Sequence, residues 1–92
     1  MRILVTPTFE RAVKKLHRQQ KADLDAAVQA IVSDAEMGEA KVGDLAGIRV
    51  YKFRTVNQLC LLSYRVLDED GVKLLTVGPH ENFYRDLKRL EN

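Results

Sequence analysis

The sequence predicts a single α+β domain with the element order β-α-α-β-β-β-α. Its 92 residues are enough chain for one hydrophobic core and too few for two. The first half carries two apolar patterns with helical spacing, and the second half carries three strand-like segments followed by one more helical pattern. Hydrophobic residues make up 46% and charged residues 30% of the chain, a balance typical of a folded, water-soluble domain and too apolar for intrinsic disorder.

The chain is expected to open with a strand that leads directly into a helix. Arg2–Val5 is short, apolar and β-branched, and Thr6–Pro7 supplies an N-cap oxygen and a proline suited to the first helical turn. Apolar residues then recur at helical spacing, and the pattern runs to about Gln19 or Gln20. The positions that carry it are Phe9, Val13 and Leu16. We therefore predict an amphipathic first helix with a narrow apolar stripe.

A second helix is predicted from Ala22 to a point near Met37–Gly38, where the glycine can adopt the left-handed cap conformation. Its apolar positions follow the same spacing: Leu24, Ala27, Val28, Ile31, Val32 and Ala35. Because the connection between the two helices is very short, we expect them to form a hairpin.

Three strands are predicted to follow as a meander. Ile48–Arg54 alternates as a strand does, so its side chains point to opposite faces: Arg49, Tyr51 and Phe53 to one, and Val50, Lys52 and Arg54 to the other. Leu59–Val66 is a nearly continuous apolar run, which is typical of a strand covered on both faces. A turn at Asp68–Gly71 then leads into a third strand at Val72–Val77.

A final helix is predicted over His80–Leu90, after Gly78–Pro79 ends the last strand. One stripe of this helix is expected to pack: Phe83, Leu87 and Leu90. Residues spaced four apart occupy a neighbouring face, which we expect to remain available: His80, Tyr84 and Lys88.

Cysteine and charge content bear on the compartment and on the partners. The lone Cys60 cannot form an internal disulfide, which agrees with a reducing compartment, and no apolar run is long enough for a membrane helix. We therefore expect a cytoplasmic protein. The formal net charge of +2 does not by itself indicate a nucleic-acid partner. Basic residues gather between Phe9 and Lys21 and acidic residues in the next stretch, which indicates either two solvated helix faces that attract each other or a functional charge patch.

No metal site and no cofactor are predicted. His17 and His80 are isolated from each other and from Cys60, without the paired spacing that places ligands around one metal. The sequence contains neither a glycine-rich phosphate loop nor a serine nucleophile elbow. Its paired acidic residues lie at a helix start and in a turn, where capping and solvation are their ordinary roles.

Two clusters could carry chemistry. Strand periodicity places Lys52 and Arg54 on one sheet face, about 7 Å apart, where either solvent separates the two cations or an anion such as phosphate bridges them. On the last helix, His80 has the side chain best suited to proton transfer near neutrality, and Tyr84 offers a ring on which a base can stack. A first-turn histidine and a half-buried tyrosine are also common structural residues, so the residues alone leave both interpretations open.

Three segments, in this order and spacing, resemble the second half of RelE/ParE-superfamily toxins: Leu45–Arg54, Leu62–Val66 and Val77–Lys88. Thr6–Phe9 followed by an amphipathic helical hairpin is similar to the opening of that family, so the resemblance covers nearly the whole chain. It implies one toxin domain over residues 1–92, in which the N-terminal helical hairpin packs on one face of a small antiparallel β-sheet.

The resemblance also implies a function, namely that of the toxin of a type II toxin-antitoxin system. RelE-like members imply a ribosome-dependent, metal-independent endoribonuclease that cuts mRNA and inhibits translation. The implied partners are a cognate antitoxin protein, the ribosome and mRNA. ParE-like members imply the alternative, a toxin that inhibits DNA gyrase without nuclease activity.

The same resemblance assigns roles to both clusters. It implies that Lys52 and Arg54 hold the phosphate and stabilise the extra negative charge of the phosphorane. It makes His80 the general acid or base, and Tyr84 the group that stacks on or orients the nucleotide.

The chain departs from the family pattern at one place. The family's nucleases commonly carry an arginine on the strand after the two cations, where this chain has apolar residues at 60–62. We expect Arg65 on the same strand, or Arg85 on the last helix, to substitute for it in substrate binding.

Overall fold

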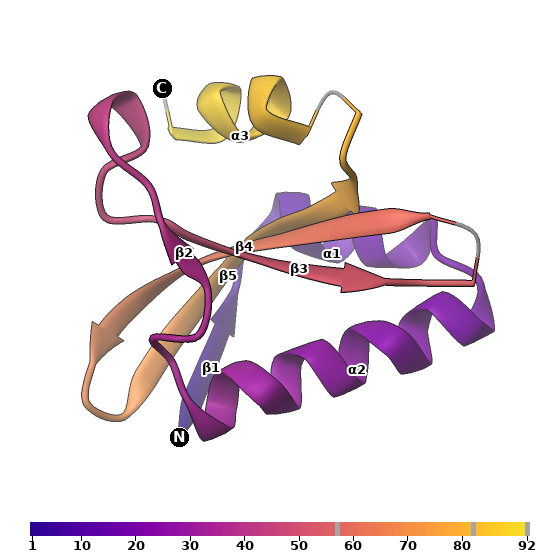
Figure 1. Ribbon diagram of the computed structural model, residues 1–92, viewed down its shortest axis with the longest axis horizontal. Helices are drawn as coiled ribbons and strands as arrows, with labels where there is room; N and C mark the ends of the chain where they lie inside the picture. Colours follow the sequence, from indigo (N-terminus) through magenta and orange to yellow (C-terminus); the bar gives the residue numbers. More distant parts are fainter. Residues whose placement is uncertain (57, 82, 92) are drawn as a thin grey trace.

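The computed structural model describes residues 1–56, 58–81 and 83–91 as a five-stranded sheet with helices on both faces (Figure 1). Along the chain the elements are β1 (Arg2–Val5), α1 (Pro7–Lys14), α2 (Arg18–Ser33), β2 (Glu39–Ala40), the 3-10 helix η1 (Gly43–Leu45), β3 (Arg49–Arg54), β4 (Leu59–Asp68), β5 (Gly71–Pro79) and α3 (Phe83–Glu91). The predicted α+β class and the order β-α-α-β-β-β-α are confirmed, with β2 and η1 as short additions before β3. In this described part of the chain, none of the helices is long and apolar enough to span a membrane.

The strands lie side by side in the order β1-β5-β4-β3-β2. β3, β4 and β5 form the predicted antiparallel meander, and β2 pairs with β3 in the same way. β1 instead runs parallel to β5, with Arg2 beside Gly71 and Val5 beside Leu74, so the sheet is mixed rather than antiparallel throughout. Most of the chain lies between these two strands, so no hairpin turn fixes their relative direction.

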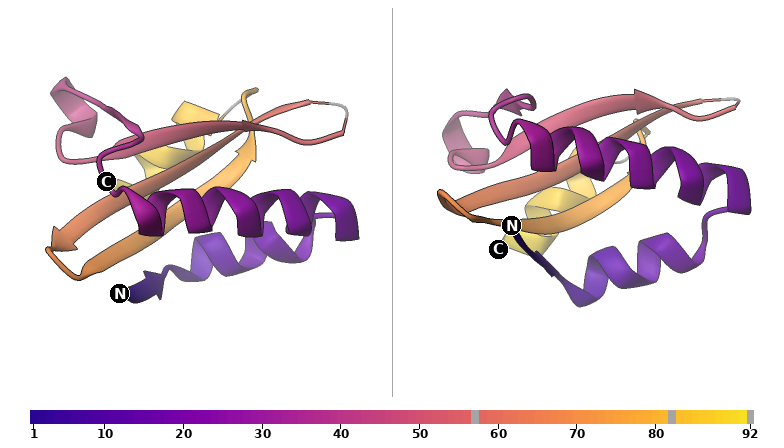
Figure 2. Two further views of the ribbon diagram at one scale, coloured as in Figure 1. Left: turned by 60° about the horizontal axis from the view of Figure 1, so that its bottom comes forward. Right: turned by 90° about the horizontal axis from the view of Figure 1, so that it is seen from below.

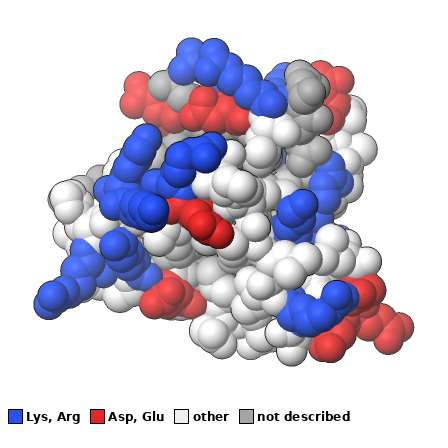
Figure 3. All heavy atoms as spheres, turned by 180° about the vertical axis from the view of Figure 1, so that it is seen from behind, with Lys and Arg blue, Asp and Glu red and all other residues white. Residues whose placement is uncertain are grey.

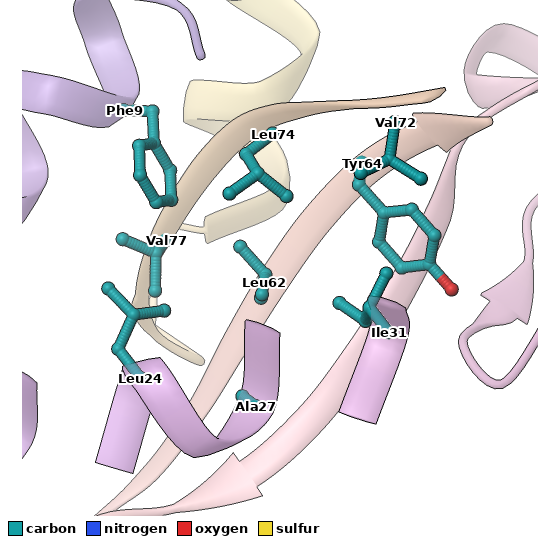
Figure 4. Packing of buried hydrophobic residues seen from close by; sticks show 9 residues of the cluster. All are labelled: Phe9, Leu24, Ala27, Ile31, Leu62, Tyr64, Val72, Leu74 and Val77. Carbon is teal, nitrogen blue, oxygen red and sulfur yellow. The ribbon is translucent and has the colours of Figure 1, made fainter. Parts of the chain in front are cut away.

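α1 and α2 form the predicted hairpin and cover one face of the sheet (Figure 2). Their amphipathic stripes supply four residues of a buried cluster, and β4 and β5 supply five. Its members are shown in Figure 4: Phe9, Leu24, Ala27, Ile31, Leu62, Tyr64, Val72, Leu74 and Val77. The start of α1 follows the sequence closely, because Thr6 caps the helix through a 2.9 Å hydrogen bond from the Phe9 N–H to its hydroxyl oxygen.

The break between α1 and α2 lies earlier than predicted. α1 ends at Lys14 rather than near Gln20, and α2 begins at Arg18. His17 is the N-cap of α2, and its backbone N–H donates to the side chain of Gln20 at 2.9 Å. The second helix therefore begins at this contact. The apolar spacing alone predicts that the first helix continues through these residues.

The end of α2 also differs from the prediction. α2 ends at Ser33, because the side chain of Asp34 accepts the N–H of Glu36 and so forms a local turn. Gly38 does not have a positive φ, so the predicted left-handed cap is wrong. Gly38 instead makes room for Tyr64, whose hydroxyl accepts the Gly38 N–H at 2.9 Å. A Cβ atom at position 38 would lie only 2.7 Å from that hydroxyl oxygen.

The opposite face of the sheet is covered by α3 and η1 (Figure 2). They pack on a second buried cluster: Leu45, Ile48, Val50, Leu61, Leu75, Phe83 and Leu87. β4 lies between the two clusters and is buried on both faces over residues 60–64, as its apolar run predicts.

β3 alternates between the two faces as predicted. Tyr51 and Phe53 pack toward the helical hairpin. Val50 packs toward α3, and Lys52 and Arg54 share its side of the strand but are exposed. On this side of β3, the two positions that lie outside the second cluster are therefore both cations.

β5 extends further than predicted. Gly78–Pro79 belong to the strand and lie opposite Cys60–Leu61 of β4. β1 pairs with β5 only as far as Leu74, so the end of β5 is a free edge on that side. Pro79 is tolerated there because its nitrogen faces the free edge, where no N–H is needed for pairing.

Candidate functional site

Lys52 and Arg54 lie exposed on the face of the sheet that carries α3. In the antiparallel register Lys52 is opposite Leu61 and Arg54 is opposite Leu59. The two cations leave the strand on the same side, about 7 Å apart. That spacing allows one anion to contact both side chains and to relieve their mutual repulsion.

His80 reaches the same face from the end of β5. Its backbone N–H donates to the carbonyl of Leu59 at 3.3 Å, so Arg54 of β3, Leu59 of β4 and His80, the residue that follows β5, lie in one row. Side chains in such a row project from the same face of a sheet. The prediction that His80 begins the last helix is wrong, because its N–H continues the sheet pairing and α3 begins at Phe83. Asn82, within the predicted helix, lies outside the described residues.

Tyr84 comes to the same place from α3. Its ring centroid lies 6.2 Å from that of His80, and the two ring planes are inclined by 81°. The His80 carbonyl accepts the N–H of Phe83 at 3.3 Å, and this turn brings the two rings together although they do not share a helix. Phe83 is buried and packs edge-to-face against Tyr84, with ring centroids 5.4 Å apart. Tyr84 is therefore held from the core side and half-buried.

Lys41 was not predicted as a site residue, yet it contacts Tyr84. Its Nζ atom lies over the Tyr84 ring, 5.2 Å from the centroid, and 3.0 Å from Oε1 of Glu39. The hydrogen bond from Lys41 is the main cause that lowers the pKa of Glu39, and the charge of Lys52 contributes in the same direction. Hydrogen bonding to Glu39, and then to Tyr84, raises the pKa of Lys41. Both groups of this ion pair are charged at neutral pH.

The sequence contains no pattern that predicts Lys41 as a site residue, because the strand that places it, β2, is very short. β2 has two residues, too few for an alternating pattern, and it pairs Glu39 with Val50 and Ala40 with Arg49. This pairing brings the segment that follows β2 beside β3 and beneath α3. No local pattern marks such a contact.

We refer to the exposed face formed by these side chains as the candidate site: Lys41, Lys52, Arg54, His80 and Tyr84. It combines two strand cations, Lys52 and Arg54, that can hold a phosphate, an imidazole that can move a proton and a phenol that can contact a base. Gly78 lies in the row of Lys52 and Leu61, and a Cβ atom there would meet no other atom within 4 Å. The sheet is thus open beside these groups.

The two arginines predicted to assist in substrate binding are placed differently. Arg65 lies six residues along β4 from Leu59, about 20 Å away. It lies instead beside Gly47, where a Cβ atom would come within 2.6 Å of its guanidinium. Arg85 is exposed and adjoins Tyr84 in α3, two residues after the buried Phe83, so it lies on the side of the helix away from the sheet.

The apolar segment at residues 60–62 is part of the core. Leu61 is fully buried in the cluster under α3, and Leu62 is fully buried under the helical hairpin. Burial is the main cause that raises the pKa of the Cys60 thiol. These residues therefore contribute packing to the candidate site and no charge.

A groove of about 560 Å³ lies along the free edge of β5, between α1 and the start of α3. Arg11 of α1 and Lys15, the residue that caps the end of α1, line it, together with Thr76–Pro79 of β5 and the acidic residues Glu81 and Asp86. Figure 3 shows Lys and Arg side chains gathered on this side of the molecule, below the mixed charges of α3. The basic first helix predicted from the sequence thus forms one wall of a groove.

Residues 3–88 match a family described as ParE-like toxins of type II bacterial toxin-antitoxin systems. The chain belongs to this family. The similarity to RelE/ParE-superfamily toxins that the three sequence segments indicate is thereby confirmed. No curated protein matches this ParE-like toxin in sequence.

Solved structures share the fold of this ParE-like toxin. The intact RelBE toxin-antitoxin complex of E. coli is 18% identical with a TM-score of 0.71, and the match covers 87% of this chain and 96% of that chain. The isolated E. coli RelE toxin is 18% identical with a TM-score of 0.69 and 97% coverage of both chains. The RelBE2 complex of Mycobacterium tuberculosis is 24% identical with a TM-score of 0.66, covering 86% of this chain and 96% of that one.

Proposed function

We propose that this toxin is a ribosome-dependent, metal-independent endoribonuclease that cuts mRNA and thereby inhibits translation. The observation that supports this proposal is the convergence of two strand cations, an imidazole and a phenol on one exposed face: Lys52, Arg54, His80 and Tyr84. β3, α3 and the residue that follows β5 supply them, and the open position at Gly78 leaves room beside them. Groups of these types at one place are what the cleavage of a phosphodiester requires.

In the proposed reaction the ribose 2′-oxygen attacks the neighbouring phosphorus and the bond from phosphorus to the 5′-oxygen breaks. A 2′,3′-cyclic phosphate and a free 5′-hydroxyl result. The 2′-hydroxyl gives up one proton and the leaving 5′-oxygen gains one, and His80 is suited to one of these two transfers, as general base or as general acid. Lys52 and Arg54 bind the phosphate oxygens as negative charge grows on them, with Arg54 as the bidentate donor. Tyr84 stacks on or orients the nucleotide.

Dependence on the ribosome follows from the small number of cations. The net charge of +2 and the few basic groups of the candidate site provide little affinity for free RNA at physiological salt. The ribosome therefore has to present the mRNA. Proton transfer by an imidazole and charge stabilisation by side-chain cations require no metal ion.

The test is cleavage of a defined mRNA by the purified toxin, with and without programmed ribosomes. We expect cleavage only when ribosomes are present, with product ends that carry a 2′,3′-cyclic phosphate. Lys52→Ala and Arg54→Ala should abolish it, whereas Lys14→Ala, which removes an exposed cation of α1, should not. Cleavage of naked RNA that a chelator abolishes would contradict both the ribosome dependence and the absence of a metal.

Inhibition of DNA gyrase without nuclease activity is the second candidate function. The observation that favours it is the buried, uncharged segment at residues 60–62, next to the two cations of β3. A supercoiling assay with purified gyrase separates the two candidates, because only this second function predicts inhibition in the absence of ribosomes and RNA.

We also propose a cognate antitoxin as the protein partner. RelBE of E. coli and RelBE2 of M. tuberculosis are toxin-antitoxin complexes that share this fold. The basic wall formed by Arg11 and Lys15, beside the free edge of β5, is suited to an acidic, amphipathic segment of such a partner.

A further inference from the structure

The contact between Lys41 and Tyr84 joins two parts of the molecule that are far apart in the chain. Lys41 follows β2 at one edge of the sheet, and Tyr84 belongs to α3, which packs across the sheet. The Lys41 side chain is only 20% exposed, which is low for a lysine, and its ammonium group lies 5.2 Å from the Tyr84 ring centroid. A cation in this position is attracted to the face of an aromatic ring.

Lys41 is held both at its backbone and at its ammonium group. Its backbone N–H donates to the carbonyl of Ile48 at 2.9 Å, and its Nζ atom is held by the carboxylate of Glu39 at 3.0 Å. The charge of Lys52 also lowers the pKa of Glu39. The ion pair of Lys41 and Glu39 therefore lies on the same side of the sheet as the cations of β3. A lysine held in this way loses little further freedom when it contacts the ring.

Tyr84 needs such a contact because the packing of α3 holds only one of its sides. Phe83 fixes the ring from the core, and His80 approaches it edge-to-face at 6.2 Å. Lys41 is the charged neighbour described on the remaining flank. Between these three groups the ring keeps one orientation. The conformational entropy of the Tyr84 side chain is therefore already lost before a substrate binds.

We propose that Lys41, oriented by Glu39, is a positioning residue that fixes the ring of Tyr84 for its contact with the nucleotide. The proposal rests on the proposed endoribonuclease function for its effect on catalysis, and on the structure of the free toxin for the contact itself. It also gives β2, a strand of two residues, a role in the candidate site.

The experiment compares Lys41→Ala, Lys41→Arg and Glu39→Gln with the control Lys14→Ala, which removes the same charge from α1 on the other side of the sheet. The Tyr84 ring is followed by NMR in protein with 13C-labelled tyrosine, and its signal is assigned from Tyr84→Phe. The kcat and KM values are measured with ribosome-bound mRNA. Thermal unfolding of each variant confirms that the fold is intact.

We expect Lys41→Ala to shift the ring signals of Tyr84 and not those of Tyr51 or Tyr64, and to lower kcat about tenfold with KM changed less than about twofold. Lys41→Arg should restore both, because a guanidinium also stacks on aromatic rings. Glu39→Gln should give a smaller change of the same kind. Lys14→Ala should change neither quantity.

Two results would overturn the inference: Tyr84 signals that do not move in Lys41→Ala, or signals that move while kcat stays at the wild-type value. A loss of kcat without movement of the ring would mean that Lys41 acts on the substrate itself, which also contradicts a positioning role. If the wild-type toxin cleaves no mRNA, the proposed function fails, and the Tyr84 signals alone decide whether Lys41 holds the ring.

Discussion

Phe83 and Tyr84 are neighbours in α3 but belong to different parts of the molecule. Phe83 is 3% exposed and packs in the cluster under the helix, whereas Tyr84 lies at the edge of that cluster against Lys41 and His80. Successive residues of a helix are turned by about 100°, so one step along α3 separates a core position from a site position. Stability and activity can therefore be changed separately at adjacent residues.

Substitutions in and beside α3 should affect stability and growth inhibition separately. Phe83→Ala should lower the free energy of unfolding by about 3 kcal/mol, because it leaves a cavity in a small core. His80→Ala and Tyr84→Ala should each lower it by less than about 1 kcal/mol, because both residues are partly exposed. These two variants should nevertheless abolish growth inhibition. Thermal unfolding and growth assays on the same variants check both statements.

The outcome that would contradict this prediction concerns the whole candidate site. If growth inhibition survives substitution of Lys52, Arg54, His80 and Tyr84, and purified gyrase is inhibited, the nuclease assignment is wrong. Only the nuclease requires those four side chains to act on one phosphate.

Gly38 and Gly78 differ in the space that each leaves for a side chain. Gly38→Ala should lower the free energy of unfolding by about 1 to 3 kcal/mol, because its Cβ atom would meet the buried hydroxyl of Tyr64 at 2.7 Å. Gly78→Ala is the control, since a Cβ atom there meets nothing within 4 Å. It should keep the stability of the wild type or raise it by up to about 1 kcal/mol. Equal losses in urea unfolding of both variants would show that the contact with Tyr64 is not the cause.

At the scale of helices and strands, the sequence predicts what depends on neighbouring residues. The alternation of β3 places Lys52 and Arg54 correctly, because period-two patterning is a local property. The break before α2 is marked by the hydrogen bond between the His17 N–H and the Gln20 side chain, which apolar spacing does not show. The direction of β1 and the contact of Lys41 with Tyr84 depend on residues far apart in the chain. Neither has a local signal.

Thr6 joins two of these elements, and its substitution should affect both. Its hydroxyl caps α1 by accepting the Phe9 N–H at 2.9 Å, and it donates to the Leu75 carbonyl of β5 at 2.6 Å. Thr6→Ala removes both bonds from a buried position and should cost about 2 kcal/mol in urea unfolding. Thr8→Ala removes a hydroxyl that accepts a 3.3 Å bond from exposed Arg11, and it should cost less than about 0.5 kcal/mol. Similar losses in the two variants would rule out the double role of Thr6.

At the scale of the whole molecule, the candidate site and the basic wall adjoin at the end of β5, where Gly78 and Pro79 also line the groove. The candidate site lies on the face with α3, and the basic wall of α1 lies beside the free edge of β5. Arg11 and Lys15 in this wall are not part of the candidate site. Substitutions in this wall therefore change the proposed antitoxin surface and leave the side chains of the candidate site in place.

Charge reversal of this wall tests the antitoxin proposal. Arg11→Glu combined with Lys15→Glu should weaken binding of the cognate antitoxin at least about tenfold, because like charges then face an acidic segment. Toxicity in the absence of antitoxin should persist. Lys21→Glu, an exposed change on α2, is the control. Calorimetry with the co-expressed product of the adjacent reading frame measures the affinity, and an unchanged value, or no complex with the wild type, would contradict the prediction.

The parallel pairing of β1 with β5 has a consequence for how the chain folds. Thr6 and Leu75, which are joined where this pairing ends, are 69 positions apart. Contacts between such distant residues form late, because the intervening chain must first lose the entropy of closing a long loop. The helices and the meander can assemble earlier from closer neighbours. Until it pairs with β5, the apolar segment Ile3–Val5 offers both of its edges to another chain, and in the folded protein it remains an exposed strand at the edge of the sheet.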